Sequence, residues 1–176
     1  MSEEKAPVLG KNVIVTVTET FRSPVTQALF GYWCAKRGSR PYPAWTDLQL
    51  MDIYKIAPQV IVRDVIDGGR EFRCRFSGTG ISAVLGLDGT GELLCETYNP
   101  QAVEMIKARY GPVLETQGPV RAVGYVTAVQ KNLPTAFESV YLPLAGKDGA
   151  IGHIIVAYDF TYQPTPDEPQ PPGEAS

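Results

Sequence analysis

The chain has 176 residues, of which 44% are hydrophobic, and a formal net charge of −3 at neutral pH. This length is typical of one domain, and the apolar content is sufficient for one substantial core. The negative charge provides no general attraction to nucleic acid or to anionic membranes. No apolar run approaches the roughly 20 residues needed to cross a bilayer. We therefore expect a protein with neither a nucleic-acid partner nor a membrane partner.

The N-terminus and the cysteines indicate the cellular compartment. Residues 1–7 are acidic and lack the basic and apolar regions of a signal peptide, which predicts a cytoplasmic protein. The cysteines are odd in number and widely spaced, at Cys34, Cys74 and Cys95. We expect them to be reduced thiols that serve mainly as buried apolar groups.

Residues 1–20 form an N-terminal extension with one weak strand signal. Residues 13–17 alternate apolar with polar or β-branched side chains, which permits a short strand. The first clear helix is predicted at residues 24–36, because Ser23 suits the N-cap and Pro24 suits the first helical position.

A second helix is predicted at residues 47–56, where apolar residues recur at helical spacing before Pro58. The two helices make up a flanking region at residues 21–58. The first of them carries more apolar surface than a solvent-facing helix needs. These apolar residues include Ala28, Phe30 and Trp33. We expect this helix to cover a sheet face of its own subunit or of a partner, in a homodimer.

After Pro58 the apolar pattern changes to a period of two. Residues 59–66 and 71–77 flank an Asp-Gly-Gly turn and predict a hairpin. Side chains of a strand point alternately to opposite faces, so the apolar ones are expected to share one face. These are Phe72, Cys74 and Phe76, and the opposite face then carries Arg73 and Arg75.

A glycine-rich stretch follows the hairpin and predicts a helical cap. Two glycines bracket Thr79, whose hydroxyl is placed to cap a helix at residues 81–85. Further helical segments are predicted at residues 91–96 and 100–115, the latter from apolar residues at helical spacing.

Three more strands are predicted at residues 120–129, 135–144 and 151–162, separated by turn sequences. Two strands, several helices and three strands predict an α+β fold with a five-stranded antiparallel sheet and a helical cap, over residues 59–162. Residues 163–176 are rich in proline and acidic residues and lack a large apolar side chain. They are expected to form a disordered tail.

Residues spread along this pattern carry a resemblance to a known family. They are Tyr32-Trp33, Arg37-Gly38, Pro43, Asp47, Pro58, Asp64, Phe72-Arg73, Arg75-Phe76, Gly78-Thr79, Gly86, Asp88, Thr90-Gly91, Leu142-Pro143-Leu144 and Asp148-Gly149. Across residues 29–160 the chain resembles a PAS domain of the single-domain PAS_5 group found in bacterial proteins. The resemblance implies the PAS fold, with a sheet and cap that enclose either a small-molecule pocket or a solidly packed core.

PAS domains commonly bind ligands or cofactors and dimerise through a flanking helix. The resemblance therefore implies a sensory or interaction domain that acts in signal transduction on a separate protein, such as a kinase. We expect cap and sheet residues to surround a mostly apolar cavity of roughly a few hundred Å³ for an unidentified small molecule. The predicted ligand-binding residues are Phe76, Thr79, Ile81, Ile106, Tyr125 and Tyr141.

The sequence argues against haem and against flavin, and it does not identify any other cofactor. Haem-binding PAS domains usually place their ligand on the long helix, whereas the single histidine, His153, falls on the last strand. We expect His153 to be a partly buried imidazole with a hydrogen-bond partner. The Cys74-Arg75-Phe76 run superficially resembles the cysteine motif of flavin-binding light sensors but lacks its flanking residues. A metal site is not expected, because the chain has neither a Cys-x-x-Cys pair nor a second histidine.

Other polar residues leave alternatives open. Arg73 and Arg75 could hold an anion, pair with Glu71, Asp64 or Glu138 on neighbouring strands, or face a partner helix. We place both arginines in an interface. Tyrosines on strands and loops could line the pocket or pack in the core. They are Tyr98, Tyr125, Tyr141 and Tyr158.

Catalysis has little support in the sequence. No Ser-His-Asp or Cys-His group can be assigned, so we expect a protein that is not an enzyme. Two alternatives remain. One is a small-molecule enzyme of another curved-sheet α+β fold with an aspartate base and a tyrosine hydroxyl, and the other is an adaptor with a filled core.

Overall fold

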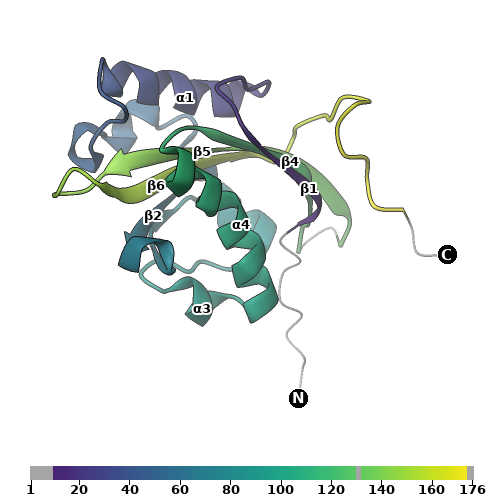
Figure 1. Cartoon of the computed structure of the whole chain (residues 1–176). Helices are drawn as coiled ribbons and strands as arrows, with labels where there is room; N and C mark the ends of the chain where they lie inside the picture. The colour runs from purple at the N-terminus through teal and green to yellow at the C-terminus, as the bar shows by residue number, and fades with distance from the viewer. Residues whose placement is uncertain (1–9, 130–131, 174–176) are drawn as a thin grey trace.

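A six-stranded antiparallel sheet in the order β1-β4-β5-β6-β2-β3 organises the described part of the chain (Figure 1). The computed structural model describes residues 10–129 and 132–173. The strands are β1 Lys11–Val17, β2 Val60–Ile66, β3 Glu71–Ser77, β4 Val120–Thr127, β5 Pro134–Ala145 and β6 Ile151–Asp159. The helices are α1 Pro24–Arg37, α2 Thr79–Leu85, α3 Leu94–Thr97 and α4 Pro100–Thr116. Short 3-10 turns occur at Trp45–Asp47, Leu50–Ile53, Ala57–Gln59 and Asp67–Gly69.

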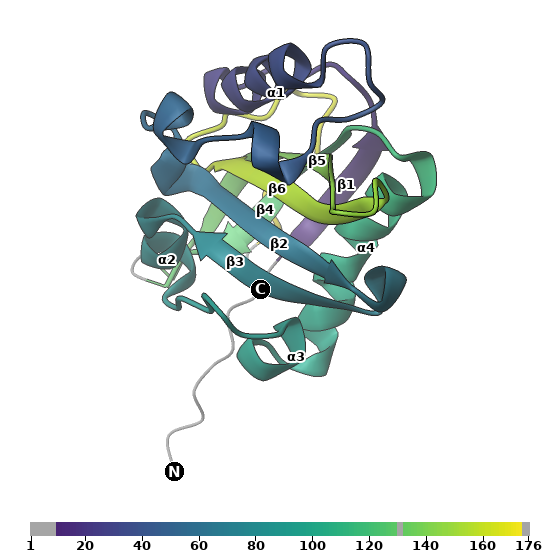
Figure 2. The same cartoon turned by 90° about the vertical axis from the view of Figure 1, so that its left-hand side faces the viewer.

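Helices cover both faces of the sheet. Figure 2 shows α1 above the sheet and α3 below it, with the β2–β3 hairpin in front. An inner cluster lies between the sheet and helices α2 to α4, and it includes Ile61, Phe72, Ile81, Leu94, Ile106, Tyr110, Phe137, Tyr141, Ile154 and Val156. An outer cluster lies under α1, and it includes Leu29, Trp33, Leu48, Ile53, Val60, Val62, Val140, Leu142, Leu144 and Ile155. Consecutive residues of β6 alternate between the two clusters, as a strand requires.

The predicted α+β sheet with a helical cap is confirmed, and one strand is added. β1 pairs with β4, with Ile14 opposite Val123, which makes the sheet six-stranded rather than five-stranded. The pattern at residues 13–17 permits a strand but does not identify its partner, which lies about 100 residues further along the chain.

The leading helix forms where its capping residues predict. The Ser23 hydroxyl accepts the N–H of Val25, Pro24 occupies the first turn, and Gly38 ends the helix with φ 59°. Trp33 is fully buried against the sheet of its own subunit, and its Nε1–H donates to the Pro143 carbonyl at 2.9 Å. Most of the apolar surface of α1 is therefore covered by the same chain.

The predicted helix at residues 47–56 is wrong. Two 3-10 turns replace it, with extended backbone at Leu48 (ψ 143°) and Gln49 (ψ 119°) between them. Leu48 and Ile53 both bury their side chains in the outer cluster. Residues five apart on an α-helix point about 140° away from each other, so a continuous helix would expose one of the two.

The β2–β3 hairpin has the predicted strands, but a β-bulge changes which residues share a face. The register shifts between Val62 and Arg63, so Phe76 pairs with Val62 and packs on the outer cluster. Phe72 and Cys74 stay in the inner cluster, and the expectation that Phe76 joins them is wrong. One extra residue in a strand reverses the facing of every residue beyond it.

The start of α2 also differs from the prediction. Gly78, and not Thr79, occupies the N-cap position, and no side chain caps this helix. A Cβ at position 78 would collide with the carbonyl oxygens of Ala57 and Pro58, so only glycine fits there. The Thr79 side chain is exposed.

Part of the C-terminal segment contacts the sheet, which its composition did not predict. The Glu168 carboxylate pairs with Arg121 of β4 at 2.7 Å and accepts the Tyr162 hydroxyl at 2.7 Å. Burial by itself would raise the pKa of Glu168, but the N–H of Thr165, the Tyr162 hydroxyl and the Arg121 guanidinium hold it at about 2. Glu168 is therefore ionised throughout the physiological pH range. Its ion pair with Arg121 holds the C-terminal segment against the sheet over the same range.

Candidate functional site

Two arginines lie deep between the sheet and α4. Arg63 of β2 is 4% exposed and Arg109 of α4 is 3% exposed. Arg63 shares the inner face of β2 with Ile61, and its Nε donates to the Tyr110 hydroxyl at 2.9 Å. Arg109 donates from Nη1 to the Tyr158 hydroxyl at 3.3 Å, and its guanidinium lies 5.3 Å from the centre of the Phe137 ring.

Three tyrosines lie between these arginines. The hydroxyls of Tyr141 and Tyr158 are 3.1 Å apart, and Ser139 donates to Tyr141 at 2.9 Å. The rings of Tyr110 and Tyr141 meet edge to face, with centres 5.6 Å apart. We call Arg63, Arg109, Tyr110, Tyr141 and Tyr158 the arginine–tyrosine network.

Tyr110 and Tyr141 of this network remain neutral. Burial raises the pKa of Tyr110 to about 12 and raises that of Tyr141 well above its ordinary value. Neither hydroxyl supplies a negative charge near pH 7. Within the described residues Arg63 makes no ion pair, so its charge is stabilised there by neutral groups alone. A buried charge costs several kcal/mol unless polar partners compensate it.

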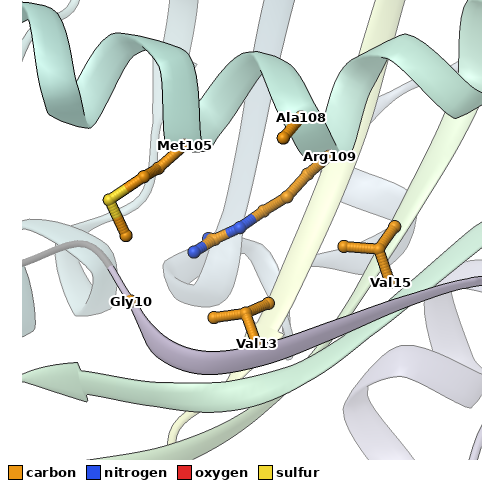
Figure 3. A pocket seen from close by; sticks show the side chains of 6 residues that line it. All are labelled: Gly10, Val13, Val15, Met105, Ala108 and Arg109. Atoms are coloured by element: carbon orange, nitrogen blue, oxygen red, sulfur yellow. The ribbon is translucent and has the colours of Figure 1, made fainter.

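A pocket of about 240 Å³ opens beside this network, between α4 and β1 (Figure 3). Its lining residues are Gly10, Val13, Val15, Met105, Ala108 and Arg109. Figure 3 shows the Arg109 side chain extending from α4 toward β1, with Met105 and Val13 on either side of its end. A Cβ on Gly10 would collide with Nη2 of Arg109, so the glycine leaves room for the guanidinium. The pocket therefore combines aliphatic walls with one cationic group.

A second, shallower pocket of about 380 Å³ lies at the start of the cap. Its lining residues are Leu50, Met51, Tyr54, Ala57, Pro58, Phe76, Ser77, Gly78 and Thr79. Met51 and Tyr54 rank among the exposed large hydrophobic residues of the described chain.

Among the described residues, the six predicted ligand-binding residues lie in three different places. Phe76 and Thr79 line the second pocket. Ile81, Ile106 and Tyr141 lie in the inner cluster. The hydroxyl of Tyr125 donates to the Pro169 carbonyl in the C-terminal segment. The bulge that moves Phe76 to the outer cluster is one cause of this separation. The role of these six residues in ligand binding stays a prediction.

The predicted interface residues differ from one another in how deeply they are buried. Trp33 is fully buried in its own subunit, Phe30 is half-buried, and Ala28 is exposed. Arg73 and Arg75 are exposed on the face opposite the buried Phe72 and Cys74. Trp33 is therefore not available to a partner subunit.

Arg75 and His153 both contact the carboxylate of Asp64, on the outer face of the sheet. Arg75 binds the Asp64 carboxylate through two nitrogens, at 2.6 and 3.0 Å. The Nδ1 of His153 lies 2.7 Å from the same carboxylate, and Trp45 packs beside the imidazole with ring centres 5.7 Å apart. The expected partly buried histidine with a polar partner is confirmed, as is the pairing of Arg75 with a neighbouring strand.

The cysteines only partly follow the sequence prediction. Cys74 is buried, Cys34 is half-buried and Cys95 is exposed, and all three are free thiols. Within the described residues, no group of three or more histidine, cysteine, aspartate or glutamate side chains is placed to hold a metal ion. No helix in the same residues is both long and apolar enough to cross a membrane.

Sequence reasoning missed Arg63 and Arg109, although each had a detectable signal. Arg63 interrupts the apolar run V-I-V-R-D-V-I of β2. Arg109 follows Ile106 by three residues and precedes Val113 by four, which places it on the buried face of α4. A charge in phase with a buried face indicates a polar interior.

The PAS_5 family model, described as a PAS domain, matches residues 21–157. This match spans most of the chain, and the chain belongs to the PAS domain family. A search of the curated proteins finds no match.

Solved PAS and sensory proteins are similar to this chain at low sequence identity. An RNA-binding light-oxygen-voltage receptor is 14% identical with a TM-score of 0.46; the similarity covers 85% of this chain and 38% of the receptor chain. A PAS domain from Colwellia psychrerythraea is 14% identical with a TM-score of 0.44, covering 63% of this chain and 96% of that one. A sensory box sensor histidine kinase from Vibrio cholerae is 14% identical with a TM-score of 0.40, covering 62% and 89%. The chain thus spans well under half the length of the receptor.

Proposed function

We propose that the protein is a sensory PAS domain that binds a small molecule and acts on a separate signalling protein, such as a kinase, in the cytoplasm. The observation that carries this proposal is the arginine–tyrosine network with the pocket beside it. Replacing buried ionic groups with apolar residues is often neutral or stabilising, so a core that served stability alone would not need two buried arginines. Their presence supports a binding function for this interior.

A search for bound small molecules tests the proposal. We expect the purified protein either to release a small molecule on denaturation, detected by mass spectrometry, or to gain thermal stability from a member of a metabolite library. A ligand present at 100 times its dissociation constant stabilises the folded state by about 2.7 kcal/mol, which such a screen detects. A protein that carries nothing and responds to no compound would instead support the adaptor with a filled core.

We further propose that the protein is a homodimer that uses the exposed side of α1. Ala28 and Ala35 are both exposed and lie seven residues apart, which places them on the same side of the helix. Arg73 and Arg75 remain proposed interface residues. Because Arg63 and Asp64 are consecutive on β2, a shift of this strand would move both the buried network and the Asp64–Arg75 pair. A ligand would bias such a shift only through different affinities for the two arrangements.

The double variant Ala28→Arg/Ala35→Arg is expected to convert the dimer to a monomer, because it places two charges in the proposed interface. Sedimentation equilibrium at micromolar concentration measures the change. Ala83→Arg, at an exposed position of α2, is the matched control and should remain dimeric. Arg75→Ala should weaken the dimer while leaving ligand affinity within a few-fold. A wild-type protein that is monomeric at this concentration would contradict the proposal.

A further inference from the structure

We propose that the face of β4 around Arg121 is a docking site for an extended, acidic peptide segment of the separate signalling protein, and that residues 163–173 of the chain's own C-terminal segment occupy this site as a displaceable mimic. This inference rests on the proposed function, because it names the kind of partner segment that the sensory domain would bind.

One carboxylate joins the C-terminal segment to the sheet. Glu168 accepts Nη2 of Arg121 and the hydroxyl of Tyr162, both at 2.7 Å. Nη1 of Arg22 lies 3.7 Å from the same carboxylate. Two guanidinium groups and a phenol hydroxyl therefore converge on a single acidic side chain, and charge-assisted hydrogen bonds of this kind are the stronger ones in proteins. The surface is complementary in charge to an acidic residue.

Two further contacts bind main-chain carbonyls of the segment. Tyr125 of β4 donates to the carbonyl of Pro169 at 3.1 Å, and Asn12 of β1 donates to that of Gln170 at 3.3 Å. Figure 1 shows the segment, in yellow, on the side of the sheet that carries β4 and β1. Every peptide has such carbonyls, and these two directly follow the acidic residue. The surface thus recognises an extended segment by one acid and its backbone.

The core of the protein holds the receptor side of this surface in place. Nε of Arg121 donates to Glu138 at 2.8 Å, and Glu138 has no exposed surface. Burial and the Glu168 carboxylate raise the pKa of Tyr162 to about 12, so its hydroxyl stays a donor at neutral pH. A prepositioned guanidinium loses less side-chain entropy when it binds a carboxylate. Arg121 and Tyr162 are therefore arranged for an acidic group from the same chain or from another.

Polar contacts are the main attachment of the C-terminal segment. Residues 163–173 contain no large apolar side chain, and none of them is buried. Docking exchanges water contacts for protein contacts, which gives a small net gain per hydrogen bond, and it orders the backbone, which is costly. The docked and released arrangements therefore differ little in free energy. An acidic segment of a partner can bind the released arrangement and shift the population toward it.

A fluorescent peptide with the sequence of residues 163–173 tests docking from a second molecule. Two full-length variants release the site: Glu168→Gln removes the carboxylate, and the other replaces residues 164–173 by a glycine–serine sequence of the same length. Thermal unfolding checks that both are folded, and fluorescence anisotropy measures binding. We expect both to bind the peptide at least tenfold more tightly than the wild type, because a tethered segment competes at roughly millimolar effective concentration. If the glycine–serine variant binds no more tightly than the wild type, the proposal is overturned.

Two altered peptides test whether the acid is the recognised group. Glu168→Gln in the peptide is expected to weaken binding to the glycine–serine variant at least tenfold. Asp167→Asn is the matched control, because Asp167 is exposed and accepts the Thr165 hydroxyl within the segment itself. This peptide should bind as the unaltered one does. Equal losses from the two substitutions would indicate general charge attraction and would contradict a specific site.

Sedimentation of Glu168→Gln tests whether the segment occupies the site of its own chain. The variant should keep the oligomeric state of the wild type. A wild-type dimer that becomes a monomer on this substitution would place the segment in the site of a second copy, against the arrangement proposed here.

The outcomes separate this inference from the proposed function. If the peptide binds neither variant while the search for small molecules finds a ligand, the inference fails and the sensory function stands. If the peptide binds with the expected dependence on Glu168 and no small molecule is found, the docking site stands and the adaptor with a filled core replaces the sensory function.

Discussion

Replacing Glu138 with alanine is expected to lower the free energy of unfolding by about 3–5 kcal/mol, the cost of breaking a buried ion pair by removing one partner. Glu138 lies on β5 with no exposed surface. Its carboxylate accepts the backbone N–H of Ser23 at 3.0 Å, the Thr26 hydroxyl, and Nε of Arg121 at 2.8 Å. The substitution would leave donors at the start of α1 and a half-buried guanidinium with fewer acceptors.

Equilibrium unfolding in urea measures this loss. Glu104→Ala is the matched control, because Glu104 is exposed on α4 and the same substitution there should change stability by no more than about 0.5 kcal/mol. Glu138→Gln keeps the shape of the side chain and should cost less than alanine. If Glu138→Ala cost no more than the control, the carboxylate would not be what joins α1 to the sheet.

Trp33→Ala is expected to cost about 3–5 kcal/mol, the usual range for removing a large aromatic side chain from a core. The indole is fully buried in the outer cluster, and its Nε1–H satisfies the Pro143 carbonyl of β5. Alanine would leave a cavity under α1 and a buried carbonyl without its donor.

Urea unfolding of Trp33→Ala and of Tyr54→Ala provides the comparison, because Tyr54 is 63% exposed and loses few contacts on truncation. The Tyr54 variant should stay within about 0.5 kcal/mol of the wild type. The loss in Trp33→Ala should not depend on protein concentration. A loss that varies with concentration would place the indole in an interface between subunits and contradict its burial in one chain.

Local signals in the sequence predicted most of the secondary structure. Helix α1 has a capping serine and a proline at its start, and β3 alternates apolar and charged residues between two turns. Such signals act over a few residues and need no distant partner. The predicted helix at residues 47–56 failed because Leu48 and Ile53 both bury their side chains in the outer cluster, which also contains residues of α1 and of distant strands.

The candidate site depended on information that is not local. A bulge at Arg75 of β3 carries Phe76 to the outer face, and only the pairing of β2 with β3 shows where the extra residue lies. The pocket next to Arg109 forms where β1 and α4 meet, which are about 90 residues apart in the chain. An apolar run that contains one arginine does not show whether that charge faces solvent, a carboxylate or a pocket.

The sequence by itself determined the α+β class, the succession of the five core strands along the chain, the helical cap and the resemblance to PAS domains, because alternation, helical spacing and turn residues are local properties. The tertiary structure decided that β1 completes the sheet, that α1 covers the sheet of its own chain, and that Arg63 and Arg109 lie inside. These outcomes depend on the register of strand pairs and on contacts between distant segments, where a shift of one residue exchanges the buried and exposed faces.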